Sequence, residues 1–151
     1  MNELDAILTS ARERLAGSPR VRLGSVREPG GIRRALGGRA KIVPVHEAWH
    51  LGVLLIGDDA LWHTGSVLRA SEEVRRGYTA ESQRERAAIR AMAFRGGFSE
   101  GETFHYDWTP ITSPSDAPLT PDGDRVMIRW SPAGFLMPLA DYLDERISLM
   151  S

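Results

Sequence analysis

The stretch VHEAWHLGVLLIGDDALWH, residues 45–63, decides the fold, because it begins with a match to the zinc motif H-E-x-x-H. A zinc hydrolase of this kind needs a helix, in which His46 and His50 lie one turn apart and share the ion while Glu47 acts as the base. In a strand, the Cα atoms of the two histidines lie about 13 Å apart, at about 3.3 Å per residue. Because one ion cannot join them across that distance, the secondary structure decides whether this motif can bind zinc.

Two local signals favour a strand over a helix. Apolar residues recur with a period of two from Val43 to Leu55, interrupted only at Glu47, and valine and aromatic residues are frequent there. A helix that starts at Pro44 is the alternative, but Gly52 would interrupt it. We therefore expect a strand and no metal site.

The sequence GDD, residues 57–59, predicts a tight turn that folds this strand back onto LWHTGSVLR, residues 61–69. The resulting register places Gly52 opposite Gly65 and leaves a shallow groove where neither strand has a side chain. The candidate binding residues surround this groove: Trp49, Gly52, Trp62, Gly65 and Arg69.

Histidines supply the candidates for acid–base chemistry. On the predicted hairpin, His50 and His63 share a face but lie four positions apart. His105 and Asp107 lie two apart on one face of a later strand, about 6.6 Å between Cα atoms, and could form a triad with an unidentified serine. The catalytic candidates are therefore His50, His63, His105 and Asp107.

Two other patterns receive structural interpretations. GFSEG, residues 97–101, fits the G-x-S-x-G nucleophile elbow, but that elbow needs a strand before the serine and a helix after it. Here a helix precedes and a strand follows, so we expect a helix end and a loop. The aromatic residues Phe104, Tyr106 and Trp108, together with Trp130, are expected to line the core face of a sheet.

The remaining elements indicate an α+β fold. We expect helices from Asn2 to Gly17, from a cap at Thr79 to Gly97, and from Pro138 onward. Strands are expected within residues 101–108 and 125–130, antiparallel to each other, and a proline-rich loop over residues 109–123. These elements predict an antiparallel sheet of about four to five strands built from hairpins, with the three helices mainly on one face.

Composition narrows the class of protein. The chain has 151 residues, 42% hydrophobic and 26% charged, which is typical of one globular domain spanning residues 1–151. The longest apolar run is far too short for a membrane span. The absence of cysteine excludes thiolate metal sites and cysteine nucleophiles. We expect a cytoplasmic protein with no membrane contact and no cofactor.

The charge is unevenly distributed along the chain. Residues 18–41 contain seven basic residues and one acid, a net +6, whereas the whole chain carries −1. This segment has no aromatic residue to stack on a base and is broken by glycines, so we do not expect nucleic-acid binding. We expect an extended arm that lies over the acidic C-terminal half. The nucleic-acid alternative predicts salt-sensitive binding that weakens when Arg33, Arg34 and Arg39 are removed.

Four stretches, EAWHLGVLL (47–55), RRGYTAESQRERA (75–87), RGGFSEGETFHYDW (95–108) and MPLADYLDERI (137–147), resemble a group of small proteins from GC-rich bacteria, some labelled glutaminase. The resemblance implies hydrolysis of an amide. Serine-type glutaminases use an S-x-x-K pair, yet the only lysine is Lys41, and Gly38 stands three residues before it. No catalytic residue of the known glutaminases can therefore be carried over.

Two classes of function follow from these patterns. The first is a binding module for a protein partner or a small ligand, expected to form a homodimer. The second is an amide hydrolase with a histidine-containing site, and a less favoured version of it is the zinc hydrolase through HEAWH.

Overall fold

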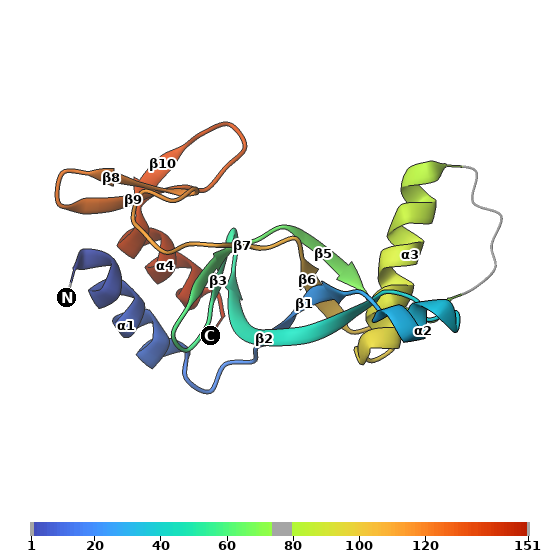
Figure 1. Ribbon diagram of the computed structural model, residues 1–151. Coiled ribbons are helices and arrows are strands. Elements are labelled where there is room, and N and C mark those ends of the chain that lie inside the picture. The colour runs from blue at the N-terminus through green and yellow to red at the C-terminus, as the bar shows by residue number, and fades with distance from the viewer. Residues whose placement is uncertain (1, 74–79, 151) are drawn as a thin grey trace. The chain divides into compact units, whose positions relative to one another are not determined.

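A computed structural model describes residues 2–73 and 80–150 of the chain (Figure 1). The elements follow in chain order: α1 (Glu3–Leu15), β1 (Val21–Arg27), α2 (Gly31–Ala35), β2 (Lys41–Leu51), β3 (Leu54–Ile56), β4 (Leu61–His63), β5 (Ser66–Arg69), α3 (Glu81–Gly96), β6 (Thr103–Tyr106), β7 (Thr109–Pro110), β8 (Leu119–Asp122), β9 (Arg125–Arg129), β10 (Leu136–Pro138) and α4 (Leu139–Ser148).

The strands form two sheets, so the α+β class is confirmed. The larger sheet has the strand order β5-β6-β1-β2-β3-β4-β7, and the smaller one has the order β10-β9-β8. In the larger sheet, β1 runs parallel to β6, with Arg22 beside Phe104 and Leu23 beside His105. The expected sheet of about four to five antiparallel strands is therefore too small, and the larger sheet is mixed.

Contacts divide the chain into two compact units, each assembled from separate segments. Unit 1 consists of residues 1–20, 48–64 and 108–151, and unit 2 consists of residues 21–47 and 65–107. The chain passes from unit 2 into unit 1 within β2, between Glu47 and Ala48. Each unit has its own cluster of buried apolar residues.

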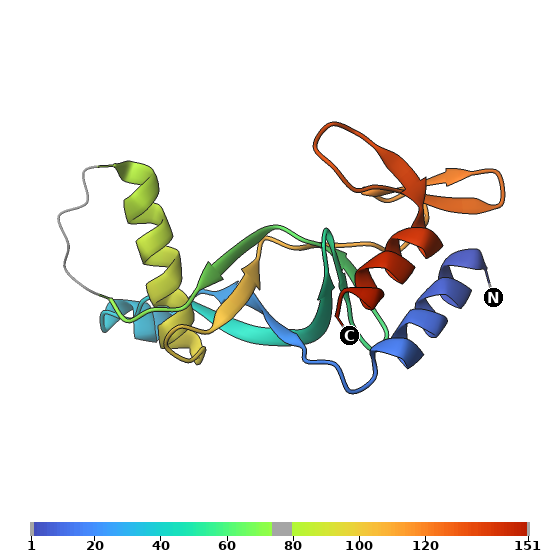
Figure 2. The same cartoon turned by 180° about the vertical axis from the view of Figure 1, so that it is seen from behind.

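In unit 1, α1 and α4 lie side by side (Figures 1 and 2). The Asn2 side chain caps α1 by accepting a hydrogen bond of 2.8 Å from the backbone N–H of Asp5, as its residue type predicts. Pro138 directly precedes α4, as expected. Both helices turn their apolar residues into the unit 1 core: Leu4, Leu8, Ala11, Leu15, Leu139, Tyr142, Leu143 and Ile147.

In unit 2, α3 packs against a separate cluster, so the three main helices do not share one core. Its end is as predicted, because Gly97 adopts a φ of +115° that glycine tolerates. The helix begins after Ala80, and the expected cap Thr79 lies outside the described residues. The cluster comprises Ile42, Ala70, Ala93, Phe98 and Phe104.

The hairpin of residues 43–69 differs from the prediction at one glycine. The expected pairing across the turn at residues 57–59 is confirmed, since Leu54 pairs with His63 and Ile56 pairs with Leu61. However, Gly52 adopts a φ of +64° and ends the preceding strand, so Leu51 pairs with Leu54 across a second, tighter turn. The long strand predicted from the alternating pattern is therefore two strands, β2 and β3.

Two segments expected to be irregular contain strands. Within the expected arm of residues 18–41, β1 lies between β6 and β2 in the sheet, and the short helix α2 follows it. The expected loop of residues 109–123 includes β7 and β8. Consequently β9 pairs with β8 and β10, and the prediction that it pairs with the strand at 101–108 is wrong. No described helix is long and apolar enough to cross a membrane.

Candidate functional site

The HEAWH motif lies in an extended strand. His46 and His50 both belong to β2, so the one-turn spacing that a zinc hydrolase requires is absent. The His50 Nε2 atom lies 2.9 Å from the carbonyl oxygen of Gly52 at the end of the strand. Within the described parts of the chain, no group of three His, Asp or Glu side chains is arranged to hold a metal ion.

The groove predicted between Gly52 and Gly65 does not form. Gly52 lies in the turn after β2, and the Tyr142 hydroxyl fills the space that a side chain there would take. That hydroxyl donates a hydrogen bond of 3.0 Å to the Leu51 carbonyl and accepts one of 2.9 Å from the Val53 N–H. Gly65 instead packs against the backbone carbonyl of Asp107.

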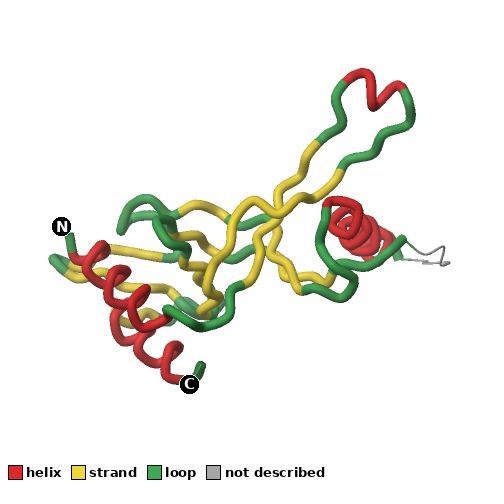
Figure 3. The backbone as a smooth tube through the Cα atoms, turned by 90° about the horizontal axis from the view of Figure 1, so that it is seen from below, coloured by secondary structure: helices red, strands yellow, loops and turns green. Residues whose placement is uncertain are grey.

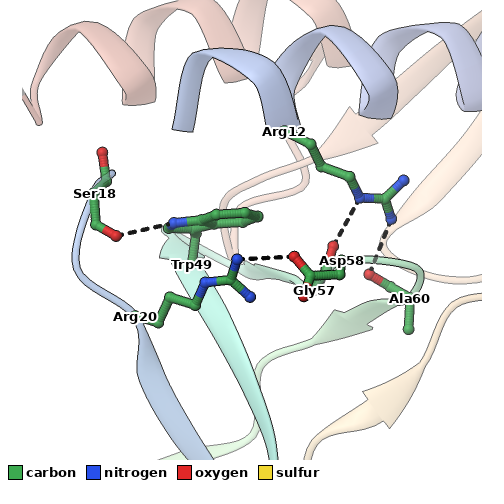
Figure 4. A network of polar contacts seen from close by, with 7 residues as sticks. All are labelled: Arg12, Ser18, Arg20, Trp49, Gly57, Asp58 and Ala60. Atoms are coloured by element: carbon green, nitrogen blue, oxygen red, sulfur yellow. Dashed lines mark hydrogen bonds and ion pairs between the residues drawn. The ribbon is translucent and has the colours of Figure 1, made fainter. Parts of the chain in front are cut away.

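Trp49 is a structural residue of unit 1 (Figure 4). Its ring is 3% exposed, its Nε1 donates a hydrogen bond of 3.1 Å to the Ser18 carbonyl, and the Arg20 guanidinium lies 3.9 Å from the ring centre. Arg20 also bonds Asp58 at 2.8 Å and lowers the pKa of that carboxyl group. Nearby, Arg12 donates to the Gly57 carbonyl at 2.7 Å. These contacts hold the end of α1 and the Asp58 turn together and leave no ligand surface on Trp49.

Trp62 and Arg69 are the two remaining binding candidates. Trp62 is buried and contacts Trp108 edge to face, with 6.0 Å between the ring centres. Arg69 is exposed on β5, and its carbonyl accepts a hydrogen bond of 3.1 Å from the Arg90 side chain.

His50 and His63 do not share the face of the hairpin that was predicted for them. His50 aligns with Leu55 and, through it, with Trp62, which is the residue before His63. Because successive strand residues point to opposite faces, His50 and His63 lie on opposite faces of the hairpin, which corrects the expectation.

His105 and Asp107 do not share a strand face either. His105 is fully buried in β6, paired with Leu23 on one side and Val67 on the other. The strand ends at Tyr106, and Asp107 adopts a φ of +59°, which turns the backbone out of the strand. The predicted triad geometry is therefore absent.

The structure brings His63 into a different site, a cavity of about 570 Å³ in unit 1 that we call the His63 pocket. This volume is in the range of small-molecule sites. Prolines, hydroxyl groups, an arginine and a tryptophan make up most of its wall. The full lining is Val53, His63, Ser115, Ala117, Pro118, Leu119, Thr120, Arg129, Trp130, Ser131 and Pro132.

One wall of the pocket is a loop that Asp116 holds in place. Its carboxylate accepts hydrogen bonds from the backbone N–H of Thr112 at 2.8 Å and of Ser113 at 3.1 Å, and these bonds lower its pKa. The other end of the loop is tied to β9, because the Arg129 N–H donates to the Pro118 carbonyl at 2.8 Å. The prolines and hydroxyls of the wall therefore have a defined position.

Another part of the wall comes from the end of β9 and the residues that follow it. Trp130 stacks on Phe135 with 6.1 Å between ring centres, yet remains 37% exposed, so the prediction that it lies in a core is wrong. The Arg129 guanidinium donates a hydrogen bond of 2.9 Å to the Gly134 carbonyl, which orients it across the hairpin between β9 and β10. A flat apolar ring and a cation thus stand next to each other.

The electrostatics of the pocket favour negative charge. Arg129 is a permanent cation, and among the described residues no carboxylate lines the wall. Burial lowers the pKa of His63, so its imidazole is neutral at physiological pH and can either donate or accept a hydrogen bond. The arrangement can bind an anionic group beside an apolar one.

Sequence reasoning identified only His63 among these residues. The proline-rich segment 109–123, which was predicted only as a loop, could have indicated Ser115 to Thr120, since long irregular segments between strands often carry binding sites. The contribution of β9 was missed because its pairing with β8 was not predicted.

The chain matches no family model, no curated protein and no solved structure in the comparisons made. The chemistry of the His63 pocket must therefore indicate the function by itself.

Proposed function

We propose that this protein is a binding module whose His63 pocket takes a small organic anion with a flat apolar body. The observation that carries the proposal is a cavity of ligand size in which the charged side chain Arg129 has no lining carboxylate, among the described residues, to neutralise it. Burying an unpaired cation beside a ligand is favourable only if the ligand brings the opposite charge.

Each wall of the pocket has a role in this proposal. Arg129 contacts the carboxylate or a similar group, with a pair of N–H donors suited to two oxygens. Trp130 covers the flat face of the ligand. Neutral His63 and the Thr120 hydroxyl offer hydrogen bonds to whichever polar groups the ligand body carries.

Benzoate and benzamide form a matched pair of probes, because they share shape and differ in charge. We expect benzoate to bind at least about tenfold more tightly than benzamide, because a charge-assisted hydrogen bond at an exposed arginine contributes at least that difference in affinity. Quenching of tryptophan fluorescence measures both affinities. Arg129→Gln should remove this difference, whereas Arg125→Gln, at the other end of β9 and outside the pocket, should preserve it. Equal binding of the two probes to the unaltered protein would refute the proposal.

The amide hydrolase is the second candidate, and it uses the same pocket. It is supported by His63, whose lowered pKa leaves it neutral and able to act as a base, and by the hydroxyls of Ser115 and Ser131, which line the same pocket. It predicts ammonia release from glutamine above background, lost in His63→Ala. Release at the background rate would remove this candidate and leave the binding module standing.

The homodimer remains a prediction for either candidate. Light scattering of the whole protein over a range of concentrations tests it directly, since a dimer doubles the mass.

A further inference from the structure

A second candidate surface lies in unit 2, and its residue types differ from those of the His63 pocket. We call residues 27–41 the basic tip. It consists of the short helix α2, the residues on either side of it, and the adjoining ends of β1 and β2, and Figure 3 shows α2 at the end of these two strands. Every residue of this helix is exposed to solvent.

The tip exposes two aliphatic side chains that the fold does not use. Ile32 is 81% exposed and Leu36 is 83% exposed, the highest values for large apolar side chains among the described residues. Four positions apart in and just after α2, they lie on the same side of the turn. Such side chains mark an interaction site when polar residues surround them.

The surroundings of these two side chains are strongly basic. Residues 27–41 contain five cations and one acid, a net +4. Arg34 lies 3.5 Å from Glu28, and Arg39 lies 2.8 Å from Glu73. Within the described residues, no ion pair is formed by Arg27, Arg33 or Lys41.

Cations and aliphatic side chains of the tip line one groove with a volume of about 850 Å³. Its lining combines four cations, one acid and three aliphatic side chains with Pro29 and four glycines: Arg27, Glu28, Pro29, Gly30, Gly31, Ile32, Arg33, Leu36, Gly37, Gly38, Arg39, Lys41 and Val43. A groove of this kind fits a convex chain segment better than a flat surface, because side chains of the segment can enter it.

Charge and shape together select the occupant. Two copies joined tip to tip would bring two net charges of +4 together, which disfavours a symmetric dimer through this surface. Nucleic acid would meet the cations but would gain nothing from Ile32 and Leu36, and the tip has no aromatic residue to stack on a base. A flat anionic membrane would not fill the groove.

We infer that the basic tip is a docking surface for an acidic, aliphatic-rich peptide segment of a partner protein. Aliphatic side chains of the segment cover Ile32 and Leu36, and its carboxylates pair with Arg27, Arg33 and Lys41. This site is separate from the His63 pocket, so either one can fail without the other.

The test is selection of a displayed library of random 12-residue peptides on the whole protein, followed by fluorescence anisotropy with the selected peptides in isolation. We expect the enriched peptides to combine Leu, Ile or Val with Asp or Glu, and their affinity to fall as salt is raised. A variant with Ile32→Ser and Leu36→Ser should bind at least about tenfold more weakly.

A charge variant and its matched control locate the binding. The substitutions Arg27→Gln, Arg33→Gln and Lys41→Gln together should weaken binding by at least about tenfold. The control combines three substitutions of exposed arginines elsewhere, Arg84→Gln, Arg86→Gln and Arg125→Gln, and should leave binding unchanged. Circular dichroism should show that all variants are folded.

Several results would overturn the inference. Enriched peptides without acidic residues, or peptides that bind the tip variants as well as the unaltered protein, would exclude this docking mode. Binding to vesicles of anionic lipid or to duplex DNA that is tighter than to any selected peptide, and is lost in the tip variants, would assign the surface to another partner class. Self-association lost in the tip variants would assign it to a second copy.

Discussion

The contact between Tyr142 and the turn at Gly52 yields the sharpest prediction for unit 1. One buried hydroxyl satisfies two backbone groups, the Leu51 carbonyl at 3.0 Å and the Val53 N–H at 2.9 Å. Tyr142→Phe keeps the ring, which is 2% exposed, and removes only this oxygen. Both backbone groups then lose a partner in a place with little access to water.

An unsatisfied buried group lowers the free energy of unfolding by about 1–3 kcal/mol. The Leu51 carbonyl is buried, whereas Val53 is only half-buried and can partly recover a bond to water. We therefore expect Tyr142→Phe to reduce the stability of unit 1 by about 2 kcal/mol, which corresponds to a fall in Tm of roughly 4–8 °C in a chain of this size.

A second substitution tests whether the hydroxyl really occupies the space beside the turn. Gly52→Ala forces a side chain onto a φ of +64°, at about 1–2 kcal/mol, and places its Cβ where the Tyr142 oxygen lies. Tyr142→Phe vacates that space. The double variant should therefore lose about 1–2 kcal/mol less stability than the two single variants lose when their losses are added.

Urea unfolding followed by tryptophan fluorescence reports on unit 1, because all four tryptophans belong to it: Trp49, Trp62, Trp108 and Trp130. The control is Ser148→Ala, which removes an exposed hydroxyl from the same helix and should change stability by less than about 0.5 kcal/mol. A loss below about 0.5 kcal/mol for Tyr142→Phe, or strict additivity with Gly52→Ala, would refute the reasoning.

Three further predictions concern single groups. The hydrogen-bonded Arg22 lowers the pKa of the Glu102 carboxyl group. The stabilising contribution of this carboxyl group is therefore present above its ordinary pKa and is lost as the pH falls through the lowered value. Glu102→Gln should flatten the acid side of a curve of stability against pH measured by circular dichroism. Burial lowers the pKa of His63 below 6.5, so an NMR titration should give a midpoint under that value, and stability should decline as the pH falls below 6.5; a midpoint at or above 6.5 would contradict this. Gly96→Ala places a Cβ against the Ile42 backbone carbonyl and should lower the free energy of unfolding by about 1–3 kcal/mol in urea, and an unchanged midpoint would show that the helix end can shift freely.

Local signals in the sequence were enough for the helices and one turn. The spacing of apolar residues and the cap at Asn2 predicted α1, and the same reasoning placed α4 after Pro138. The register across residues 57–59 was also predicted, because a two-residue turn leaves each strand one way to pair. These features depend on residues only a few positions apart.

The strand at HEAWH was also predicted from the local pattern, but the position where this strand ends was not. Gly52 reads as a weak position inside a strand, and it becomes a turn because the Tyr142 side chain, 90 positions later, satisfies the backbone there. Likewise, the basic segment 18–41 contains β1 because β6 offers it hydrogen-bond partners. A local pattern cannot show which distant strand will supply such partners.

The candidate site shows the same division. From the sequence alone, His63 was singled out as a catalytic candidate on the hairpin, and the stretch 109–123 was predicted only as a proline-rich loop. Only the tertiary structure decided that His50, His105 and Asp107 point elsewhere, and that Arg129 and Trp130 join His63 around one cavity. The physical reason is that side-chain direction follows strand register, and register between strands distant in the chain is set by competition for backbone hydrogen bonds and core space.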